Sequence, residues 1–457
     1  MIEAIAPANT TFILLSFEGP DRYSLAGGLG MRVGELSRAL AEAGYQTHVV
    51  FVGDPHARAI ESRCGGRLVL HRWCQWLSQY YPGGVYDGEE AKLVDFAESA
   101  PRFVVDDLAR PAVERGDLVV VLGEEWQTAE TMCRVSDLLH EHGQRGRGVL
   151  LWNANNTMGF HRLNWGRLGF ATTITTVSRY MKHLMWDYGV NPQVIPNGIP
   201  ERLLRPVPDE AGDWLRQSCR KPVVLTKVGR WDPDKRWLMA VDTVAQLKAR
   251  GLDTVLLARG GVESHGSEVL DHARGLGLAV RDVAVADQSP AGYARAFADA
   301  GPADVLNVKS FIPLDQLRLL YAGSDAVLAN SGREPFGLVG LETMASGGVA
   351  FTGATGEDYA VHLQNAIALE TEDSDEAAWY VAYLRAHPAV RERIVRAARR
   401  TAQRFVWAQA VDLLVRRAEL VAARQGALQP AAVLSPALEA ALAEAVAAPE
   451  PLAAGAD

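Results

Sequence analysis

The sequence has few cysteines, no long apolar run and no excess of positive charge, and each absence excludes a class of protein. The four cysteines, Cys64, Cys74, Cys133 and Cys219, form no CxxC pair and have no histidine cluster beside them. This pattern predicts free thiols rather than a disulfide framework or a zinc site. No stretch is long enough to span a bilayer, and MIEAIAPANT lacks the regions of an export signal, so a cytoplasmic protein is expected. The net charge of -9 argues against nucleic acid as a partner.

The chain has 457 residues, more than one ordinary core accommodates, and this length predicts two domains of about 150–200 residues each. Short apolar segments alternate with segments of helical spacing, which is typical of a parallel sheet covered by helices on both faces. The predicted fold class is therefore α/β, with two tandem Rossmann-like doubly wound domains that face a cleft. The expected strands are 12–17, 47–52, 118–122, 149–152, 171–177, 223–228, 254–258, 304–308, 326–329 and 348–352.

Composition sets the expected domain limits. The Pro-rich, charged segment 201–214 reads as a linker between a first domain, 1–205, and a second domain, 206–405. A helix over 406–425 is expected to pack back on the first domain. The Ala/Pro-rich tail, 426–457, is expected to be mostly disordered.

A basic helical region covers residues 389–425 and contains six arginines between 391 and 404. We expect these arginines to lie on a helix face that is exposed to solvent. Attachment to an anionic membrane surface through these arginines is the alternative.

A glycine-rich loop, SLAGGLGMRVGEL, follows the first strand and opens a helix. Gly27, Gly28 and Gly30 allow close approach of a ligand, and the free amides of a helix start favour an anion. The loop is neither a GxGxxG fingerprint nor a P-loop. A tight turn without a ligand is the alternative.

The stretch KVGRWDPDKRW places Arg230 and Lys235 at the end of the first strand of the second domain. Two cations there suit a diphosphate, with arginine as a fork and lysine as a point charge. A solvated basic loop is the alternative. Asp232 and Asp234 spell DxD, but a proline lies between them and cations surround them, so no metal site is predicted.

The most specific stretch is NSGREPFGLVGLETMASGG, residues 330–348. Glu334 precedes a helix that is expected to start near Gly337, and Glu342 lies on that helix on the face of Leu338. Free amides between the two carboxylates suit a diphosphate with a sugar on either side. A capping glutamate plus a surface glutamate is the alternative.

Two polar stretches end strands of the first domain. Glu124, Glu125 and Trp126 follow the strand 118–122, so the tryptophan is a candidate to stack on a sugar and a glutamate to orient an acceptor. A tryptophan packed under a loop is the alternative.

The second polar stretch is NANNTMGFHRLNW, residues 153–165. Asn153, Asn155 and Asn156 suit sugar hydroxyls because amides donate and accept hydrogen bonds without carrying charge. His161 either reaches the site or only caps the next helix.

These motifs carry a resemblance. The E-x7-E stretch, GR-x4-K, ITTVSRYMKHLMWDYGVNPQVIPNGIP and FVW (405–407) resemble the retaining nucleotide-sugar glycosyltransferases of family 4, which have the two-domain GT-B fold. The resemblance covers roughly residues 12–420. AGGLG and EEWQT are similar to elements of glycogen and starch synthases. Those enzymes have a lysine where this chain has Leu25 and a histidine where it has Asn155, which speaks against glucan elongation.

The resemblance implies roles for single residues. Glu334 would hold hydroxyls of the donor sugar, Glu342 the ribose diol, and Arg230 with Lys235 the diphosphate. The donor-binding set implied is Gly27, Gly28, Arg230, Lys235, Glu334, Phe336, Gly337, Leu338 and Glu342. The catalytic set is Arg230, Lys235, Glu334, Asn155 and His161, and the acceptor-binding set is Glu124, Glu125, Trp126, Asn153 and Asn156.

The function predicted is retaining transfer of a hexose from a UDP, ADP or GDP sugar to a hydroxyl acceptor, without metal or other cofactor. Breaking a glycosyl–phosphate bond leaves negative charge on the diphosphate, which cations and helix amides stabilise. The alternatives are a sugar-nucleotide epimerase or a glycan phosphorylase on the same fold, or a non-catalytic sugar-nucleotide-binding protein.

Overall fold

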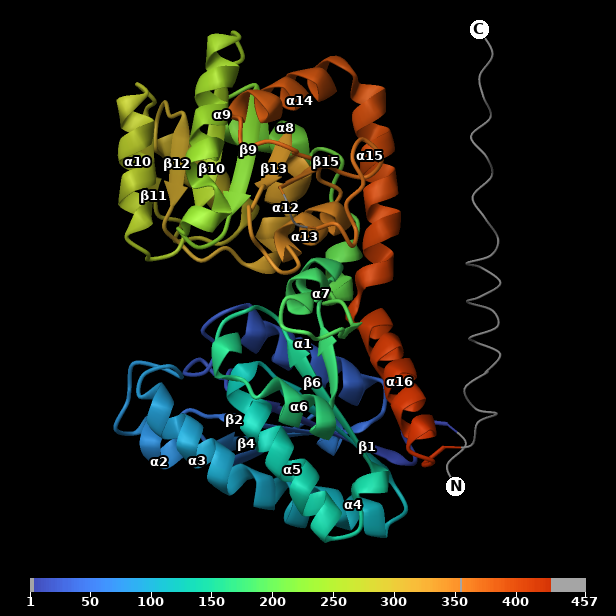
Figure 1. Ribbon diagram of the computed structural model, residues 1–457. Coiled ribbons are helices and arrows are strands. Elements are labelled where there is room, and N and C mark those ends of the chain that lie inside the picture. The colour runs from blue at the N-terminus through green and yellow to red at the C-terminus, as the bar shows by residue number, and fades with distance from the viewer. Residues whose placement is uncertain (1–3, 354–355, 429–457) are drawn as a thin grey trace, which may run out of the picture. The chain divides into compact units, whose positions relative to one another are not determined.

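The computed structural model describes residues 4–353 and 356–428, and these residues divide into two compact units (Figure 1). Of the described residues, the first unit holds 4–176, Leu184–Ile195 and 411–428, and the second holds those of Val177–His183 and Pro196–Ala410. The predicted boundary at 205/206 differs from this division, because the long segment of the second unit starts at Pro196 and a short segment, Val177–His183, also belongs to it.

The segment 201–214, predicted to be a linker, is part of the second unit. It contains a 3-10 turn, Glu201–Leu204, and the start of helix α8, Ala211–Cys219. Leu203 and Leu215 are fully buried, so the charged residues between them lie on the surface of a folded element.

The first unit has an eight-stranded sheet in the order β3-β4-β2-β1-β5-β6-β7-β8. Every neighbouring pair is parallel except β3–β4, which is antiparallel. The strands are β1 Thr10–Ser16, β2 Gln46–Val52, β3 Ile60–Arg63, β4 Leu68–Trp73, β5 Leu118–Glu124, β6 Gly148–Ala154, β7 Thr173–Thr176 and β8 Gln193–Val194. The sequence did not predict β3, β4 and β8, because β3 and β8 have no apolar run and His71 and Arg72 interrupt that of β4.

Helices surround this sheet. Helix α1 buries Val33, Leu36 and Leu40 on one face, as their spacing predicts, and Gly44 follows it with φ +100°. The helices are α1 Gly28–Glu42, α2 Gln75–Ser78, α3 Glu89–Arg102, α4 Arg110–Glu114, α5 Ala129–Glu141 and α6 Trp165–Ala171, with a π-helical turn over Phe103–Ala109. Helix α7, Arg179–Trp186, belongs to the second unit up to His183 and to the first unit from Leu184.

The second unit has a parallel sheet of seven strands in the order β11-β12-β10-β9-β13-β14-β15. All five strands predicted for this half are present, with ends shifted by at most two residues. The strands are β9 Val223–Val228, β10 Thr254–Arg259, β11 Val280–Val283, β12 Val305–Val308, β13 Ala326–Ala329, β14 Ala350–Thr352 and β15 Ile367–Ala368.

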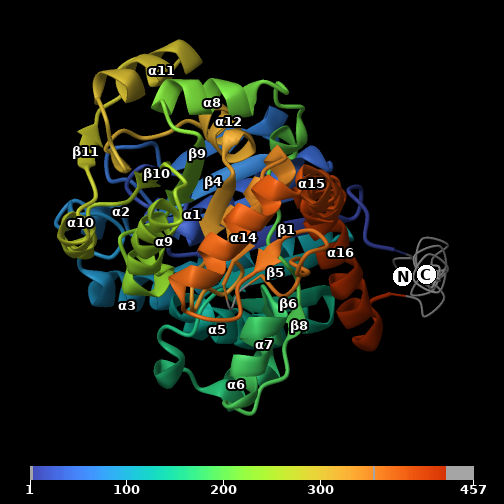
Figure 2. The same ribbon diagram turned by 90° about the horizontal axis from the view of Figure 1, so that it is seen from above.

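Two apolar layers cover this sheet, one on each face (Figure 2). Val223 and Leu225 of β9 face the layer of α9, α10, α14 and α15, whereas Val224 faces the layer of α8 and α11. Alternation of side chains along a strand thus fills both layers. The helices are α9 Trp237–Ala249, α10 His265–Gly275, α11 Pro290–Asp299, α12 Leu314–Gly323, α13 Leu338–Ser346, α14 Ser374–Ala386 and α15 Pro388–Ala402.

The basic region predicted as one helical stretch is interrupted. Helix α15 ends at Ala402, a 3-10 turn follows, and α16 covers Trp407–Arg424. Two of the six arginines bond to backbone carbonyls of the second unit: Arg391 to Ser324 and Arg399 to Leu204. None of the described helices has the length and apolar character needed to cross a membrane.

Two chain segments of the second unit pair where the chain passes between units. Ile199 donates its amide to the Phe405 carbonyl at 2.7 Å and accepts from the Trp407 amide at 3.2 Å. Gly198 permits this approach, because a Cβ there would lie 2.7 Å from Cα of Trp407.

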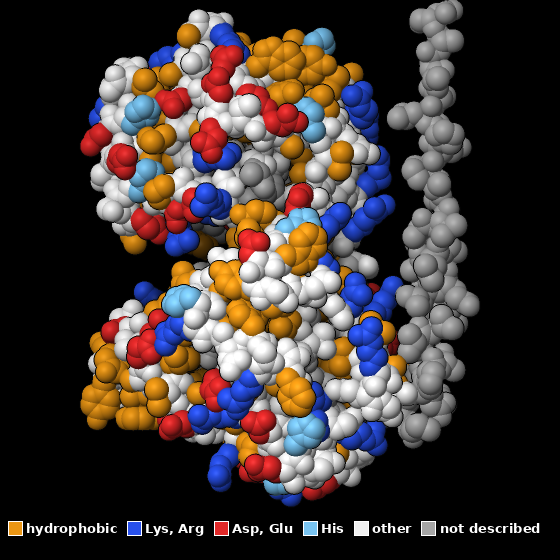
Figure 3. Space-filling view, viewed as in Figure 1, with side chains coloured by type: hydrophobic (Ala, Val, Ile, Leu, Met, Phe, Trp, Pro, Cys, Tyr) orange, Lys and Arg blue, Asp and Glu red, His pale blue; other side chains and the backbone are white. Residues whose placement is uncertain are grey.

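Exposed aromatic side chains gather over two helices (Figure 3). Trp76 on α2 is 58% exposed and Tyr80, just after it, 75%. On α14 the half-exposed Trp379 stacks on Tyr383 with 5.1 Å between ring centres. The predicted tail, 426–457, lies outside the described residues from 429 onward.

All four cysteines are free thiols. Cys74 and Cys133 are buried, Cys219 is partly buried and Cys64 is exposed. Burial raises the pKa of Cys133 to about 11, so this thiol is a poor nucleophile at neutral pH.

Candidate functional site

The two loops predicted to share a diphosphate lie side by side in the second unit. Strands β9 and β13 are hydrogen-bonded neighbours in a parallel sheet, so the loops that follow them leave the same edge. The amide of Gly332 donates to the carbonyl of Asp234 at 2.8 Å and fixes one loop against the other.

Lys235 and Glu334 join these loops by an ion pair. Lys235 Nζ lies 2.8 Å from Glu334 Oε1, and the two side chains are 21% and 24% exposed. Both charged groups are therefore held in place yet remain accessible to a small ligand. A phosphate would replace the carboxylate on Lys235 and leave Glu334 free to accept bonds from hydroxyls.

Arg230 is presented differently. Its side chain is 67% exposed and its guanidinium lies 3.5 Å from Asp232. The Arg230 carbonyl accepts a bond from Trp237 Nε1 at 2.7 Å, which holds the backbone at this residue. Asp232 caps the turn by accepting from the Asp234 amide at 2.9 Å, which gives the DxD pair a structural task. That transfer needs no metal stays a prediction.

Helix α13 begins directly after Gly337, which has φ +78°. The hydroxyl of Tyr359 donates to the Gly337 carbonyl, and the buried ring of Phe336 packs 5.8 Å from the Tyr359 ring. The Tyr359 hydrogen bond and the Phe336 ring thus hold the start of α13 in place, with the Leu338 amide in its first turn. Phe336 was predicted as a donor contact, but its ring is only 4% exposed, so the side chain supports the loop instead.

Glu342 lies in the second turn of α13, as predicted. Burial raises the pKa of Glu342 to about 7, and the nearby Glu334 carboxylate adds to the rise. Near neutral pH this carboxyl is therefore present in both forms. A carboxyl that donates as well as accepts suits the two hydroxyls of a ribose.

One residue of this site was missed. Lys227 is 2% exposed in β9, and its Nζ donates to the Leu328 carbonyl at 2.9 Å and to Asn330 Oδ1. A single cation inside the apolar run VVLTKV is the signal that would have singled it out, because lysine is almost never fully buried without a reason.

In the first unit the strand-end residues bind one another. Glu124 is fully buried and pairs with Arg32 at 3.0 Å, and its Oε2 accepts from Asn153 and Asn155, each at 2.8 Å. Asn153 Oδ1 also accepts from Thr175 Oγ1 at 3.0 Å. The prediction that Glu124 and Asn153 face a sugar is therefore wrong, since both side chains are buried and engaged inside the domain.

Glu125 is strained and buried. Its φ of +68° is unusual for a residue with a side chain, and its Oε1 accepts from the Asn155 amide at 2.6 Å. Burial raises the pKa of Glu125 to about 8, neighbouring Glu124 adds to the rise, and the Asn155 amide opposes it. At neutral pH Glu125 is therefore mainly protonated.

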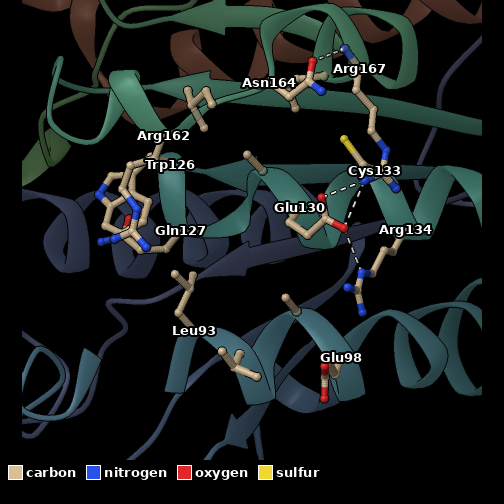
Figure 4. A pocket seen from close by; sticks show the side chains of 15 residues that line it. Leu93, Glu98, Trp126, Gln127, Glu130, Cys133, Arg134, Arg162, Asn164 and Arg167 are labelled. Carbon is tan, nitrogen blue, oxygen red and sulfur yellow. Dashed lines mark hydrogen bonds and ion pairs between the residues drawn. The ribbon is translucent and has the colours of Figure 1, made fainter. Parts of the chain in front are cut away.

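Trp126 packs under the following loop, which was the alternative considered. It is 8% exposed and lies against Gly159, where an added Cβ would be 2.3 Å from the indole Cγ. The guanidinium of Arg162 lies 4.3 Å from the ring centre. Beside them a pocket of about 340 Å³ opens between α3, α5 and α6 (Figure 4).

The remaining loop residues are accessible. His161 is exposed on a 3-10 turn whose neighbour Phe160 is buried. It does not cap the next helix, because Asn164 does so by accepting from the Arg167 amide at 3.0 Å. Asn156 is partly exposed and accepts from the Met158 amide.

The glycine-rich loop already holds an internal anion. Glu18 is 5% exposed, and its Oε2 accepts from the amides of Gly27 at 2.9 Å and Gly30 at 3.0 Å. Tyr86 donates to the other oxygen at 2.6 Å. The Gly27 amide is therefore not free for a phosphate as predicted, whereas an added Cβ at Gly28 would meet open space.

Two doubly wound units of this kind define the GT-B fold, and solved structures of other proteins share this architecture. Sucrose-phosphate synthase from Thermosynechococcus elongatus has a TM-score of 0.63 and 19% identity, over 90% of this chain and all of that one. The catalytic domain of Starch Synthase IV from Arabidopsis thaliana, bound to ADP and acarbose, has a TM-score of 0.63 and 15% identity, over 91% and 99%. Anabaena HepE in complex with UDP and glucose has a TM-score of 0.57 and 14% identity, over 89% and 99%. At these identities the likeness establishes the fold.

The sequence of the second unit is more specific. Residues 216–401 match the model of the family described as "Glycosyl transferases group 1". The chain is also 29% identical over 264 residues to D-inositol 3-phosphate glycosyltransferase of Geodermatophilus obscurus. That match covers 56% of this chain and 55% of the relative, so the chain spans about half the length of the curated relative it matches.

Proposed function

We propose that the protein is a retaining hexosyltransferase that uses a nucleoside-diphosphate sugar and a hydroxyl acceptor and needs no metal. The observation that carries the proposal is the accessible Lys235–Glu334 pair in front of the start of α13, within the segment that matches the glycosyltransferase family. The names of two structural neighbours support the donor class, since one binds UDP with glucose and the other ADP.

In this proposal Lys235, Arg230 and the first amides of α13 take the diphosphate. Glu334, released from Lys235, accepts bonds from the sugar hydroxyls, and Glu342 binds the ribose diol. The acceptor oxygen forms its bond to the anomeric carbon on the face that the phosphate oxygen leaves, and the acceptor proton passes to the departing diphosphate. The configuration is then retained, and the atoms balance without a further reactant.

The structure changes the proposal for the first unit. Glu124, Asn153 and the indole of Trp126 position the loop, so the acceptor contacts proposed there are Asn156, the side-chain oxygen of Asn155 and His161. Because Glu125 is mainly protonated at neutral pH, it would donate a hydrogen bond to its surroundings.

A thermal-shift panel of UDP, ADP and GDP sugars tests the donor. Binding stabilises the folded state by mass action, so one base should raise the melting temperature above the other two. The same donor, given with a set of saccharide acceptors, should yield free nucleoside diphosphate and a product of retained anomeric configuration. No shift with any base would overturn the proposal, and a shift without turnover would favour a non-catalytic binding protein.

A further inference from the structure

The proposed reaction assigns no role to Lys227, the buried lysine of β9. Lys227 is 2% exposed, and its two hydrogen-bond acceptors, the Leu328 carbonyl and Asn330 Oδ1, are neutral. Its Nζ also lies 5.2 Å from the ring centre of the fully buried Trp237. A buried ammonium group held only by neutral acceptors is costly, so the environment favours the uncharged amine.

Charged groups on both adjoining loops act on this amine. Lys235 and Arg236, which follow β9, oppose its protonation, while Glu334, which follows β13, favours it. Burial lowers the pKa of Lys227 to about 7, and the two cations contribute. In the free protein the residue is therefore close to half charged at neutral pH.

The position of Lys227 ties its charge to the donor loops. Asn330 is the first residue after β13 and leads to Glu334, and Leu328 belongs to β13 itself. Trp237, whose ring lies beside Nζ, also donates to the carbonyl of Arg230. Lys227 thus holds the end of β13 and contacts the side chain that fixes the loop after β9.

We propose that Lys227 is a positioning residue that takes up a proton from solvent when a diphosphate binds to the neighbouring Lys235 loop. The inference rests on the proposed function, because it needs a diphosphate at this site. The negative ligand offsets the repulsion from Lys235 and Arg236 and stabilises the ammonium form over the amine. The step balances: the nitrogen lone pair of the amine forms one N–H bond to a proton from solvent, and that proton returns to solvent when the diphosphate leaves. Rising pH therefore weakens diphosphate binding and favours product release.

Calorimetry with UDP, ADP and GDP as probes tests this coupling in the full chain. Each titration is run at pH 7.5 in two buffers of different ionisation enthalpy, so that the difference in heat gives the protons bound. A tenfold gain in affinity corresponds to a rise of one unit in the Lys227 pKa. For that gain we expect uptake of about half a proton at pH 7.5 and a fall in affinity of about tenfold from pH 6 to pH 9.

Four variants locate the proton. Lys227→Met should abolish the uptake and lower affinity about tenfold at pH 6 but hardly at pH 9, whereas a merely structural lysine would lower it equally at both. Lys227→Arg should restore affinity without uptake. Lys309→Met, at an exposed lysine, should match wild type. Glu342→Gln removes a second group of the proposed donor site that titrates near neutrality and should retain the uptake.

The outcomes separate the inference from the function on which it rests. If none of the three nucleotides binds wild type, the proposed function and the inference both fail. If one binds but wild type takes up no proton at pH 7.5, only the inference fails, even where Lys227→Met does not fold. Uptake that persists in Lys227→Met and disappears in Glu342→Gln also overturns it, because the proton then resides on Glu342.

Discussion

The two units place similar polar residues at the ends of their central strands and treat them in opposite ways. In the first unit Glu124 is fully buried, and its carboxylate is saturated by Arg32, Asn153 and Asn155. In the second unit Glu334 keeps 24% of its side chain exposed and has Lys235 as its partner on the neighbouring loop.

The origin of the counter-charge explains the difference. Arg32 comes from α1, the helix that covers the sheet, so its ion pair with Glu124 lies within the core. Lys235 and Glu334 both come from loops beyond the sheet edge, so their pair stays where a ligand can compete for it. Polar residues at the ends of strands therefore remain accessible to a ligand only where no charged residue of a covering helix pairs with them.

The largest effect is expected from breaking the buried pair. Arg32→Met leaves the Glu124 carboxylate buried without its cation and should lower the free energy of unfolding by about 3–5 kcal/mol. Urea unfolding followed by tryptophan fluorescence measures this loss. The control is Arg38→Met, at an arginine that pairs with Glu35 but is itself 43% exposed, so the loss should stay within about 1 kcal/mol. Equal losses in both variants would show that the buried Arg32–Glu124 pair contributes no more to stability than the pair of the exposed Arg38.

Removing the accessible cation should affect turnover and leave the fold intact. Lys235→Met should lower the rate of nucleoside diphosphate release by about 100- to 1,000-fold, because it removes a charge that stabilises the leaving group. The melting temperature should change little, since the side chain is partly exposed. Wild-type turnover in this variant, with Lys309→Met as the matched control, would refute the proposed role of Lys235.

Filling the space above Trp126 tests whether its ring is a packed part of the loop. Gly159→Ala adds a methyl group 2.3 Å from the indole Cγ and should cost about 1–3 kcal/mol of stability beyond the backbone strain. Gly143→Ala is a close control, since Gly143 has φ +66° against +72° for Gly159 and its Cβ would meet nothing within 4 Å. Urea unfolding of both variants isolates the contact, and equal stabilities would contradict it.

The smallest effect is expected from a histidine pair formed by the neighbouring strands β2 and β4 of the first sheet. His48 Nδ1 lies 3.0 Å from His71 Nε2, and burial lowers the pKa of each ring to about 4. The unfolded chain, with histidine pKa values near 6.5, binds more protons below that pH, so stability is present above about pH 6.5 and falls as the pH drops toward 4. Between pH 7 and pH 5.5 we expect a loss on the order of 1 kcal/mol for each ring, reduced in a His48→Gln variant, and a flat profile in wild type would exclude it.

The sequence predicted the architecture better than the burial of single residues. The apolar runs of β9, β10 and β13 predicted these strands closely, and the spacing of Glu334 and Glu342 placed one before α13 and one on it. The partners of Glu124 were not predictable, because Arg32 lies 92 residues away in the chain and only the folded sheet brings them together.

The engagement of the Gly27 amide was not predicted for a related reason, whereas the prediction for Gly28 stays a prediction. A helix start attracts any anion, and the sequence does not show that Glu18 supplies one from the end of β1. Lys227 was missed because a strand pattern predicts which face a residue occupies and does not predict which charges lie across the sheet. Contacts between charges that are distant in the sequence, and not local propensity, therefore account for the different accessibility of strand-end residues in the two units.

The hydrogen-bonded crossing at Ile199 has a consequence for the evolution and engineering of the chain. Most of the second unit is formed by the continuous segment 196–410, and hydrogen bonds between Ile199, Phe405 and Trp407 join the regions near its two ends. A fragment with adjacent ends can be excised, exchanged with the corresponding fragment of a related protein, or joined by a short linker and opened elsewhere. The pairing at Ile199 thus makes the segment 196–410 suited to exchange as a single fragment.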